Sequence, residues 1–126
     1  MIKGVQDIYY NVSDMKRAIK FYCEALQMRL VSEQDGWTAL NCGGVGVGLH
    51  PTEPGEEIFK VPRDAHGVHG QATLTLRSDD VKSDRARIEK MGGKILGEVD
   101  EPWGHMLVFE DPDANVLKLM NPKHDD

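Results

Sequence analysis

Residues 5–26 read VQDIYYNVSDMKRAIKFYCEAL, and this stretch decides the first part of the fold. Residues 5–12 alternate between two kinds of side chain, which predicts a short β-strand with one apolar face. Ser13 and Asp14 follow as N-cap residues, whose side-chain oxygens can accept free amides of a first helical turn. Apolar residues then recur every three or four positions through 15–26, which predicts a helix of about three turns.

Three more strands complete the first module. Residues 28–32 and 37–40 are strand-like, and 45–50 predicts the return strand. The segment Cys42-Gly43-Gly44-Val45 between the last two predicts a tight hairpin, because glycine accepts positive φ at little cost. The expected order in residues 1–50 is therefore β-α-β-β-β.

The same order recurs in residues 71–122. An alternating segment is followed by capping residues, an amphipathic helix that stops at Gly92-Gly93, and three strands. The expected elements are a strand at 71–76, a helix within 78–91, and strands at 94–96, 106–109 and 115–120. Asp7 and Gln71, at matching places in the two modules, are 64 positions apart (71 − 7), so an internal duplication explains the pattern best.

The connection between the modules, residues 51–70, is rich in proline, glycine and charge and has no clear period. Connections of this length tend to be either functional or disordered, and the sequence leaves both open.

Composition excludes several classes of partner. The chain has 126 residues and a formal net charge of −6, without a basic stripe, so we expect no nucleic-acid partner. It has no apolar run long enough for a membrane span and no signal-peptide core, so we expect no membrane partner. Cys23 and Cys42 cannot form a disulfide framework, and two reduced thiols predict a cytoplasmic protein.

Two segments carry a family resemblance. The string Asp7-Ile8-Tyr9-Tyr10-Asn11-Val12-Ser13-Asp14-Met15, followed by Phe21-Tyr22 and Leu26, resembles the opening of vicinal-oxygen-chelate proteins, the glyoxalase, bleomycin-resistance and dioxygenase superfamily. Phe109-Glu110-Asp111-Pro112-Asp113-Ala114-Asn115 resembles that family's F-x-D-P-D-G-N turn. The resemblance covers nearly the whole chain. It implies an α+β fold of two tandem βαβββ modules whose mixed sheets curl into a cup, with helices on the convex face.

Two residues depart from the family pattern. Gln27 stands where the family usually has the glycine that ends the first helix, and Ala114 replaces the glycine of the turn. Each substitution is expected to cost roughly 1 kcal/mol if φ is positive at that position.

The alternation of the strands and the resemblance together predict a ligand pocket on the concave face. Every second residue along these strands is almost always apolar and is expected to face the helices. The residues between them are polar and varied, and they are expected to face the opposite side of the sheet. The expected pocket residues are Asp7, Tyr9, Asn11, His50, Gln71, Thr73, Lys118, Met120, Trp103 and His105. Residues 106–109 are all apolar, so the alternation does not show which of them face the pocket.

The family's metal ligands correspond here to Asp7, Gly48, Gln71 and Lys118. Gly48 has no donor, although His50 points to the same face, and the ammonium of Lys118 puts a positive charge where a cation would sit. We therefore expect no metal cofactor, with a divalent ion as the alternative. Asp7 and Lys118 are expected to form an ion pair in its place, or else to be solvated separately.

Several other side chains have two interpretations. Trp37 and Trp103 could stack on a flat ligand, or belong to the core or a subunit interface. His105 could be a general base, a ligand donor or a polar rim residue. His66 and His69 lie in a glycine-rich loop and are expected to be solvated rather than metal-bound.

Three functions remain after these steps. The first, which we favour, is binding of a small aromatic or amphipathic molecule in the cup without the family metal. The second is a metal-dependent enzyme (a lyase, isomerase, fosfomycin-type transferase or dioxygenase), and the third is a metal-free enzyme with Lys118, His50 or Asp7 as acid or base. Whether the protein is an enzyme stays open, and the resemblance implies a homodimer.

Overall fold

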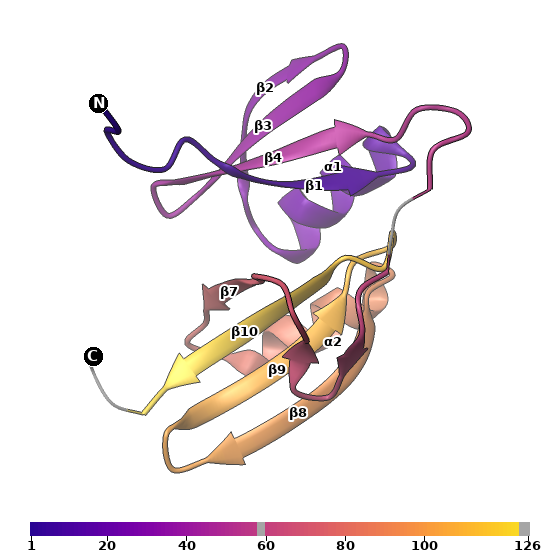
Figure 1. Cartoon of the computed structure of the whole chain (residues 1–126). Coiled ribbons are helices and arrows are strands. Elements are labelled where there is room, and N and C mark those ends of the chain that lie inside the picture. The colour runs from indigo at the N-terminus through magenta and orange to yellow at the C-terminus, as the bar shows by residue number, and fades with distance from the viewer. Residues whose placement is uncertain (58–59, 124–126) are drawn as a thin grey trace. The chain divides into compact units, whose positions relative to one another are not determined.

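The computed structural model describes residues 1–57 and 60–123. By its contacts the chain divides into two compact units, Met1–Ile58 (unit 1) and Phe59–Asp126 (unit 2). Each unit has one four-stranded mixed sheet with a helix on one face (Figure 1). The expected α+β fold of two βαβββ modules is confirmed, and the boundary between the units falls inside the predicted connection 51–70.

The sheet of unit 1 has the strand order β1-β4-β3-β2. The first strand pairs in parallel with the last, and the other neighbours are antiparallel. The strands are β1 (Ile8–Val12), β2 (Arg29–Gln34), β3 (Trp37–Cys42) and β4 (Val45–Pro51). Gly43 and Gly44 form the β3–β4 turn with φ of 57° and 96°, as the Gly-Gly pair predicts.

The helix of unit 1 is α1 (Met15–Lys20), which continues as a π-helical segment, η1 (Phe21–Ala25). As predicted, Asp14 caps the start, and its carboxylate accepts the Arg17 amide at 3.1 Å. The helical segment ends at Gln27, which has φ of 59° although it is not glycine. The core of unit 1 contains buried side chains from this segment and from the strands, namely Ala18, Phe21, Tyr22, Ala25, Val12, Leu40, Val47 and Leu49.

The sheet of unit 2 repeats this plan with the order β7-β10-β9-β8. Its elements are β7 (Leu74–Arg77), α2 (Val81–Lys90), β8 (Lys94–Glu101), β9 (Gly104–Glu110) and β10 (Val116–Pro122). Its first strand begins later than the sequence predicts. Its second strand continues beyond the predicted Leu96 because a bulge between Ile95 and Gly97 interrupts the alternation.

The turn before β10 is organised by the buried Asp111. Its Oδ1 accepts the backbone amides of Asp113 and Asn115, both at 2.9 Å. Ala114 has φ of 65°, so the positive φ considered for both departures from the family pattern is confirmed. The hydrogen bonds of Asp111 hold the strained residue in place.

The connection 51–70 contains structure that its composition does not reveal. Strands β5 (Arg63–Asp64) and β6 (Gly67–Val68) pair as a short antiparallel hairpin, which belongs to unit 2. Two-residue strands cannot establish a period, so pattern analysis could not find them.

Candidate functional site

The sheet face of unit 1 that lies opposite α1 carries aromatic and polar side chains. Strand register places Tyr9 beside Gly48, Asn11 beside His50, and Ala39 beside Gly48. Residues paired across a sheet share a face, so the predicted pocket residues of β1 and β4 do lie together. We call this surface the unit 1 face.

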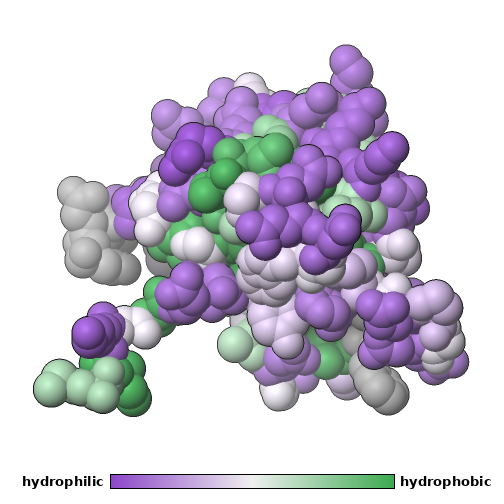
Figure 2. Space-filling view, turned by 90° about the horizontal axis from the view of Figure 1, so that it is seen from above, coloured by the Kyte–Doolittle hydropathy of each residue, from purple (hydrophilic) through white to green (hydrophobic). Residues whose placement is uncertain are grey.

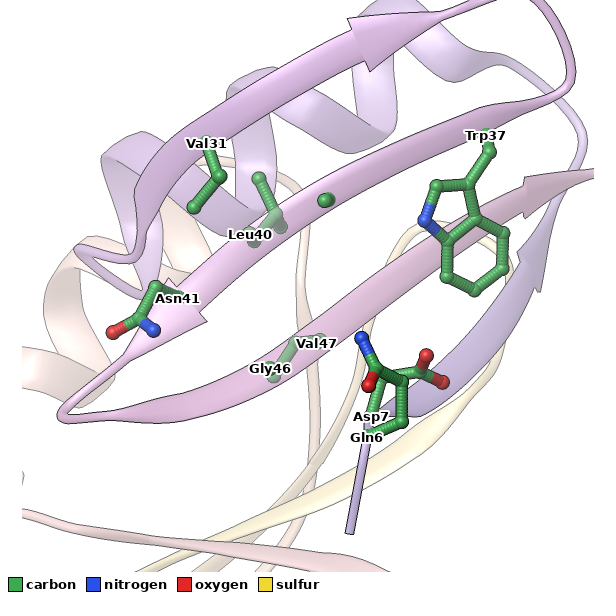
Figure 3. A pocket seen from close by; sticks show the side chains of 9 residues that line it. Gln6, Asp7, Val31, Trp37, Leu40, Asn41, Gly46 and Val47 are labelled. Carbon is green, nitrogen blue, oxygen red and sulfur yellow. The ribbon is translucent and has the colours of Figure 1, made fainter.

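Trp37 lies across Gly48. A Cβ atom built on Gly48 would overlap the Cη2 and Cζ2 atoms of the Trp37 indole. Figure 3 shows the indole extending from β3 over β4. The close approach requires glycine at position 48, because any side chain there would displace the ring.

Three rings form an aromatic trio on the unit 1 face: Tyr9, Trp37 and His50. The centroids of Tyr9 and Trp37 are 5.6 Å apart at an interplanar angle of 62°, and His50 lies 6.3 Å from Tyr9 and 6.4 Å from Trp37. These separations suit edge-to-face contacts, which orient the rings relative to one another. Tyr9 is 56% exposed, so the trio presents ring surface to solvent.

A hollow of about 200 Å³ lies beside the trio. The residues that line it are Gln6, Asp7, Val31, Trp37, Ala39, Leu40, Asn41, Gly46 and Val47 (Figure 3). Asp7, a predicted pocket residue, thus lies at the same hollow as Trp37. The hollow combines an indole, aliphatic walls, a carboxylate and amides.

The corresponding face of unit 2 is covered by the β5–β6 hairpin. Val68 of the hairpin packs against a cluster that contains Met106, Val108 and Val116. Leu96, Val99 and Met120 border the same cluster. Met106 and Val108 are therefore the members of β9 that share a face with Met120 and Lys118, as their register also requires.

Two close contacts hold the hairpin on the sheet. A Cβ atom on Gly97 would lie 2.5 Å from the Cβ of Ala65, so the hairpin turn fits against the sheet where β8 has no side chain. The guanidinium of Arg63 donates to Glu110 Oε2 at 3.0 Å and also to the carbonyl oxygen of Ala114. Because Arg63 and Glu110 are about 15% and 14% exposed, this ion pair is shielded from water.

Lys118 lies beneath the hairpin. A Cβ atom on Gly67 would lie 2.5 Å from Lys118 Cε and 3.0 Å from its Nζ. Gly67 is buried and Lys118 is half-buried. The pairing of Lys118 with Asp7 stays a prediction.

His105 does not share the face of Lys118. Its Nε2 lies 2.6 Å from Glu98 Oε2, and Glu98 Oε1 accepts from Arg85 of α2 at 2.6 Å. The two partners lower the pKa of Glu98, Arg85 contributing more than His105. His105 was expected in the pocket, but it lies on the helix side of the sheet, so we leave it out of the site.

The other predicted pocket residues of unit 2 have varied surroundings. The hydroxyl of Thr73 donates to the carbonyl of Val116 at 2.8 Å. Gln71 is exposed, and Trp103 is 47% exposed at the β8–β9 turn. These positions give Gln71 and Trp103 access to solvent without enclosing them.

The loop histidines and the thiols stay outside the site. His69 Nε2 lies 2.8 Å from the exposed carboxylate of Asp64, and the His66 amide donates to the same carboxylate. Both cysteines are free, and burial raises the pKa of each thiol, which disfavours a nucleophilic role.

The residues do not fit the family's metal. The indole of Trp37 takes the space that a side chain at Gly48 would need, and the ammonium of Lys118 cannot coordinate a cation. Within each unit, the described residues contain no group of three or more His, Cys, Asp or Glu side chains that could hold a metal ion.

The family model for the glyoxalase/bleomycin resistance protein/dioxygenase superfamily matches residues 4–119. The chain belongs to this superfamily. The match extends through both modules, so the superfamily fold is not confined to either one.

Solved structures agree with this assignment. TnmS3, an antibiotic-binding protein from Streptomyces sp. CB03234, is 31% identical, with a TM-score of 0.70 over 97% of this chain and 98% of its own. The fosfomycin resistance protein FosX from Mesorhizobium loti shares the fold at 19% identity, with a TM-score of 0.69 over 98% of this chain and 95% of its own. A protein from S. aureus, SA1046, shares it at 15% identity, with a TM-score of 0.77 over 96% and 94%. No curated protein sequence matches the chain.

The surface carries apolar side chains outside the trio. Leu30, Val31 and Val45 of unit 1 are between 41% and 53% exposed. Figure 2 shows apolar surface among hydrophilic residues on the side seen from above. None of the helices in the described ranges is long and apolar enough to cross a lipid bilayer.

Proposed function

We propose that the protein binds a small, flat aromatic molecule on the unit 1 face and does so without the family metal. The observation that carries this proposal is the indole of Trp37 lying over Gly48, at a position where the family resemblance implies a metal ligand. Loss of the ligand side chain and gain of a ring platform are the same structural change. It exchanges metal coordination for stacking on aromatic rings.

The contacts of the trio support a stacking role. Trp37 is held from one side by Tyr9 and from another by His50, so little side-chain entropy is lost when a ligand ring settles on it. The Asp7 carboxylate and the amides of Gln6 and Asn41 at the adjoining hollow provide polar groups that can fix a ligand's orientation. TnmS3, at 31% identity, is described as an antibiotic-binding protein, which supports a small organic molecule as the ligand.

The two enzymatic alternatives stay predictions, because catalysis by an acid or base calls for a titrating group tuned by its surroundings. Homodimer formation stays a prediction.

The test uses the chain's two tryptophans. Trp103→Phe leaves Trp37 as the only indole, so its fluorescence reports on the trio alone. Flat aromatic compounds, including aromatic antibiotics, should quench this emission in a saturable manner and raise the melting temperature of the protein. Trp37→Leu, with Trp103 retained, should weaken the same ligands by about fivefold, measured by melting-temperature shift, because an aromatic pair contributes about 1 kcal/mol beyond its buried area.

Metal content tests the second half of the proposal. The purified protein should contain far less than one transition-metal ion per chain, and chelation should leave ligand affinity unchanged. One tightly held ion per chain, or affinity that disappears with chelation, would overturn the metal-free site. Ligand affinity that Trp37→Leu leaves as tight as before, measured by melting-temperature shift, would overturn the aromatic platform.

A further inference from the structure

The β5–β6 hairpin has an inner face toward the sheet of unit 2 and an outer face toward solvent. Register pairs Arg63 with Val68, and both residues are partly buried. Asp64 and His69, which follow them in the chain, are exposed. Neighbouring residues of a strand point to opposite sides, so Asp64 and His69 share the outer face.

The carboxylate of Asp64 connects the two arms of the hairpin. Its Oδ1 accepts the backbone amide of His66 at 2.8 Å, which closes the turn. Its Oδ2 lies 2.8 Å from Nε2 of His69 on the second arm. The backbone amide of His69 also donates to the carbonyl of Pro62 at 2.9 Å. Both the backbone and the side chain of His69 therefore hold the second arm to the first.

The hairpin is a small element with irregular flanks. Its two strands have two residues each, and residues 60–62 and 69–73 on either side form no helix or strand. A two-stranded hairpin of this size is marginally stable by itself and depends on what it packs against. Such segments open locally at a lower free energy than global unfolding requires.

The strength of the outer pair depends on pH. The His66 amide and, to a smaller extent, the His69 ring lower the pKa of Asp64 from its ordinary 3.8. A free imidazole gains its proton as pH falls through about 6.5, and a charged pair is stronger than a neutral hydrogen bond. The contribution of the pair is therefore largest between about pH 4 and 6. It falls above this window as imidazole loses its proton, and below it as the carboxylate gains one.

The inner contacts respond differently. Among the described residues of unit 2, the titratable side chains that act on Asp64 are the two histidines, His69 and His66. The ion pair of Arg63 with Glu110, at 3.0 Å, lies on the opposite face of the hairpin and contains no imidazole. A change in the hairpin as pH passes through the imidazole range thus reports on the outer face.

We propose that the β5–β6 hairpin is a pH-sensitive cover of the unit 2 sheet, held closed more tightly by Asp64 and His69 in mild acid than at neutral pH. The inner contacts keep the hairpin in place at either pH, and the outer pair sets how often it opens. Because an exposed pair contributes little, the expected change in the opening equilibrium is about threefold. The proposal goes beyond the aromatic site, since it rests on residues of unit 2 alone and needs no ligand.

Amide hydrogen exchange, followed by nuclear magnetic resonance, measures the opening. The amide of residue 69, which donates to Pro62, reports on the hairpin, and that of the buried Leu107 in β9 reports on global unfolding. Protection factors remove the intrinsic effect of pH on exchange. The residue 69 amide should be about threefold more protected at about pH 5.5 than at about pH 7.5, and far less protected than Leu107 at both.

Three variants identify the groups responsible. His69→Gln keeps a side chain that can donate to Asp64 but does not titrate, so protection at residue 69 should not change between the two pH values. Asp64→Asn keeps an acceptor for the His66 amide without the charge, and it should lose the pH dependence as well. His66→Gln is the matched control, because it removes the other histidine of the turn and should keep the threefold change. All three should retain the far-ultraviolet circular dichroism of the native protein.

Three results would overturn the proposal. One is equal protection of the residue 69 and Leu107 amides, since the hairpin would then open only when the whole unit unfolds. Another is a pH effect that persists in His69→Gln. A third is a pH effect that disappears in His66→Gln, which would assign it to the wrong histidine.

Discussion

Unit 1 and unit 2 have the same order of strands and one helix each, but the sheet faces opposite their helices differ. The unit 1 face exposes aromatic rings beside a hollow, and the corresponding face of unit 2 is covered by the β5–β6 hairpin. Both outcomes depend on glycines: Gly48 admits the Trp37 ring, while Gly97 admits Ala65 of the hairpin. A glycine in a sheet can therefore lead either to an exposed aromatic surface, as in unit 1, or to a covered face, as in unit 2, depending on which segment packs over it.

The difference also concerns charge. In unit 2 the hairpin brings Arg63 to Glu110, so the charge of this carboxylate is compensated within the unit. In unit 1 the carboxylate at the hollow is Asp7, beside rings and amides. A duplicated scaffold thus acquires two chemically different faces without changing its periodicity.

Adding a side chain at residue 97 should have the largest effect on stability. In Gly97→Val the new Cβ meets Ala65 Cβ at 2.5 Å and Ala65 Cα at 2.8 Å, so the hairpin has to move. We expect a loss of about 3 kcal/mol in the free energy of unfolding, measured by urea denaturation, and increased binding of a hydrophobic dye as the Met106 cluster is uncovered.

The matched control lies on the open face of unit 1. Val31→Ile adds one methylene beside the hollow and should change the free energy of unfolding by less than about 0.5 kcal/mol. If Gly97→Val is as neutral as this control, the hairpin does not pack on unit 2's sheet as described.

Removal of the hairpin's ionic anchor should have the next largest effect. Arg63→Met leaves the shielded Glu110 and the Ala114 carbonyl without their donor, and we expect a loss of about 2 kcal/mol, measured by chemical denaturation. Lys123→Met, which removes the exposed pair with Asp100, should lower stability far less than Arg63→Met does. Equal losses in the two variants would show that Arg63 is no more than a surface charge.

Much of this comparison could be predicted from the sequence. Alternation and capping residues locate the two modules, and the positive φ at Gln27 and Ala114 follows from their places in the family pattern. The pocket residues of β1 and β4 share a face as predicted, because a period of two fixes the side of each residue.

The parts that sequence could not predict depend on contacts between distant residues. His105 was expected in the pocket because it starts a strand near the predicted mouth of the cup. Residues 106–109 are apolar at every position, so the sequence does not show which side of the sheet each residue of β9 faces. In the structure, Met106 and Val108 face the hairpin, which identifies the side of the sheet that each residue of β9 faces. Trp37 was considered for stacking but was not assigned to the pocket, because its position over Gly48 depends on pairing between β3 and β4. The clearest available signal was a tryptophan and a glycine at diagonal positions on one face of the expected hairpin.

The helix side of unit 2 provides a pH-dependent test. Because Arg85 and His105 lower the pKa of Glu98, the stability that Glu98 contributes is present above the ordinary carboxyl pKa of 4.5. It is lost as pH falls through the lowered value in the folded protein. Glu98→Gln should therefore be less stable than the native protein by about 1 kcal/mol near neutral pH, and the two thermal unfolding curves should converge in acid.

Glu89→Gln serves as its control. Glu89 pairs with the same Arg85 at 2.9 Å, but it is 51% exposed, so its pH profile should stay close to that of the native protein. A difference between Glu98→Gln and the native protein that persists unchanged into strong acid would contradict the ionic origin of the effect.

The smallest effects come from the two strained residues, one in each unit. Gln27→Gly and Ala114→Gly place glycine at φ of 59° and 65°, where a Cβ atom is disfavoured. Relief of strain is opposed by the larger entropy of a glycine in the unfolded chain, so we expect a net gain of no more than about 1 kcal/mol in each variant, measured by thermal unfolding. Gln27→Gly should show the larger gain, because the hydrogen bonds of Asp111 hold the turn around Ala114 in either variant. If Ala114→Gly instead lowers stability, the methyl group of Ala114 contributes more to the turn that receives Arg63 than its strain removes.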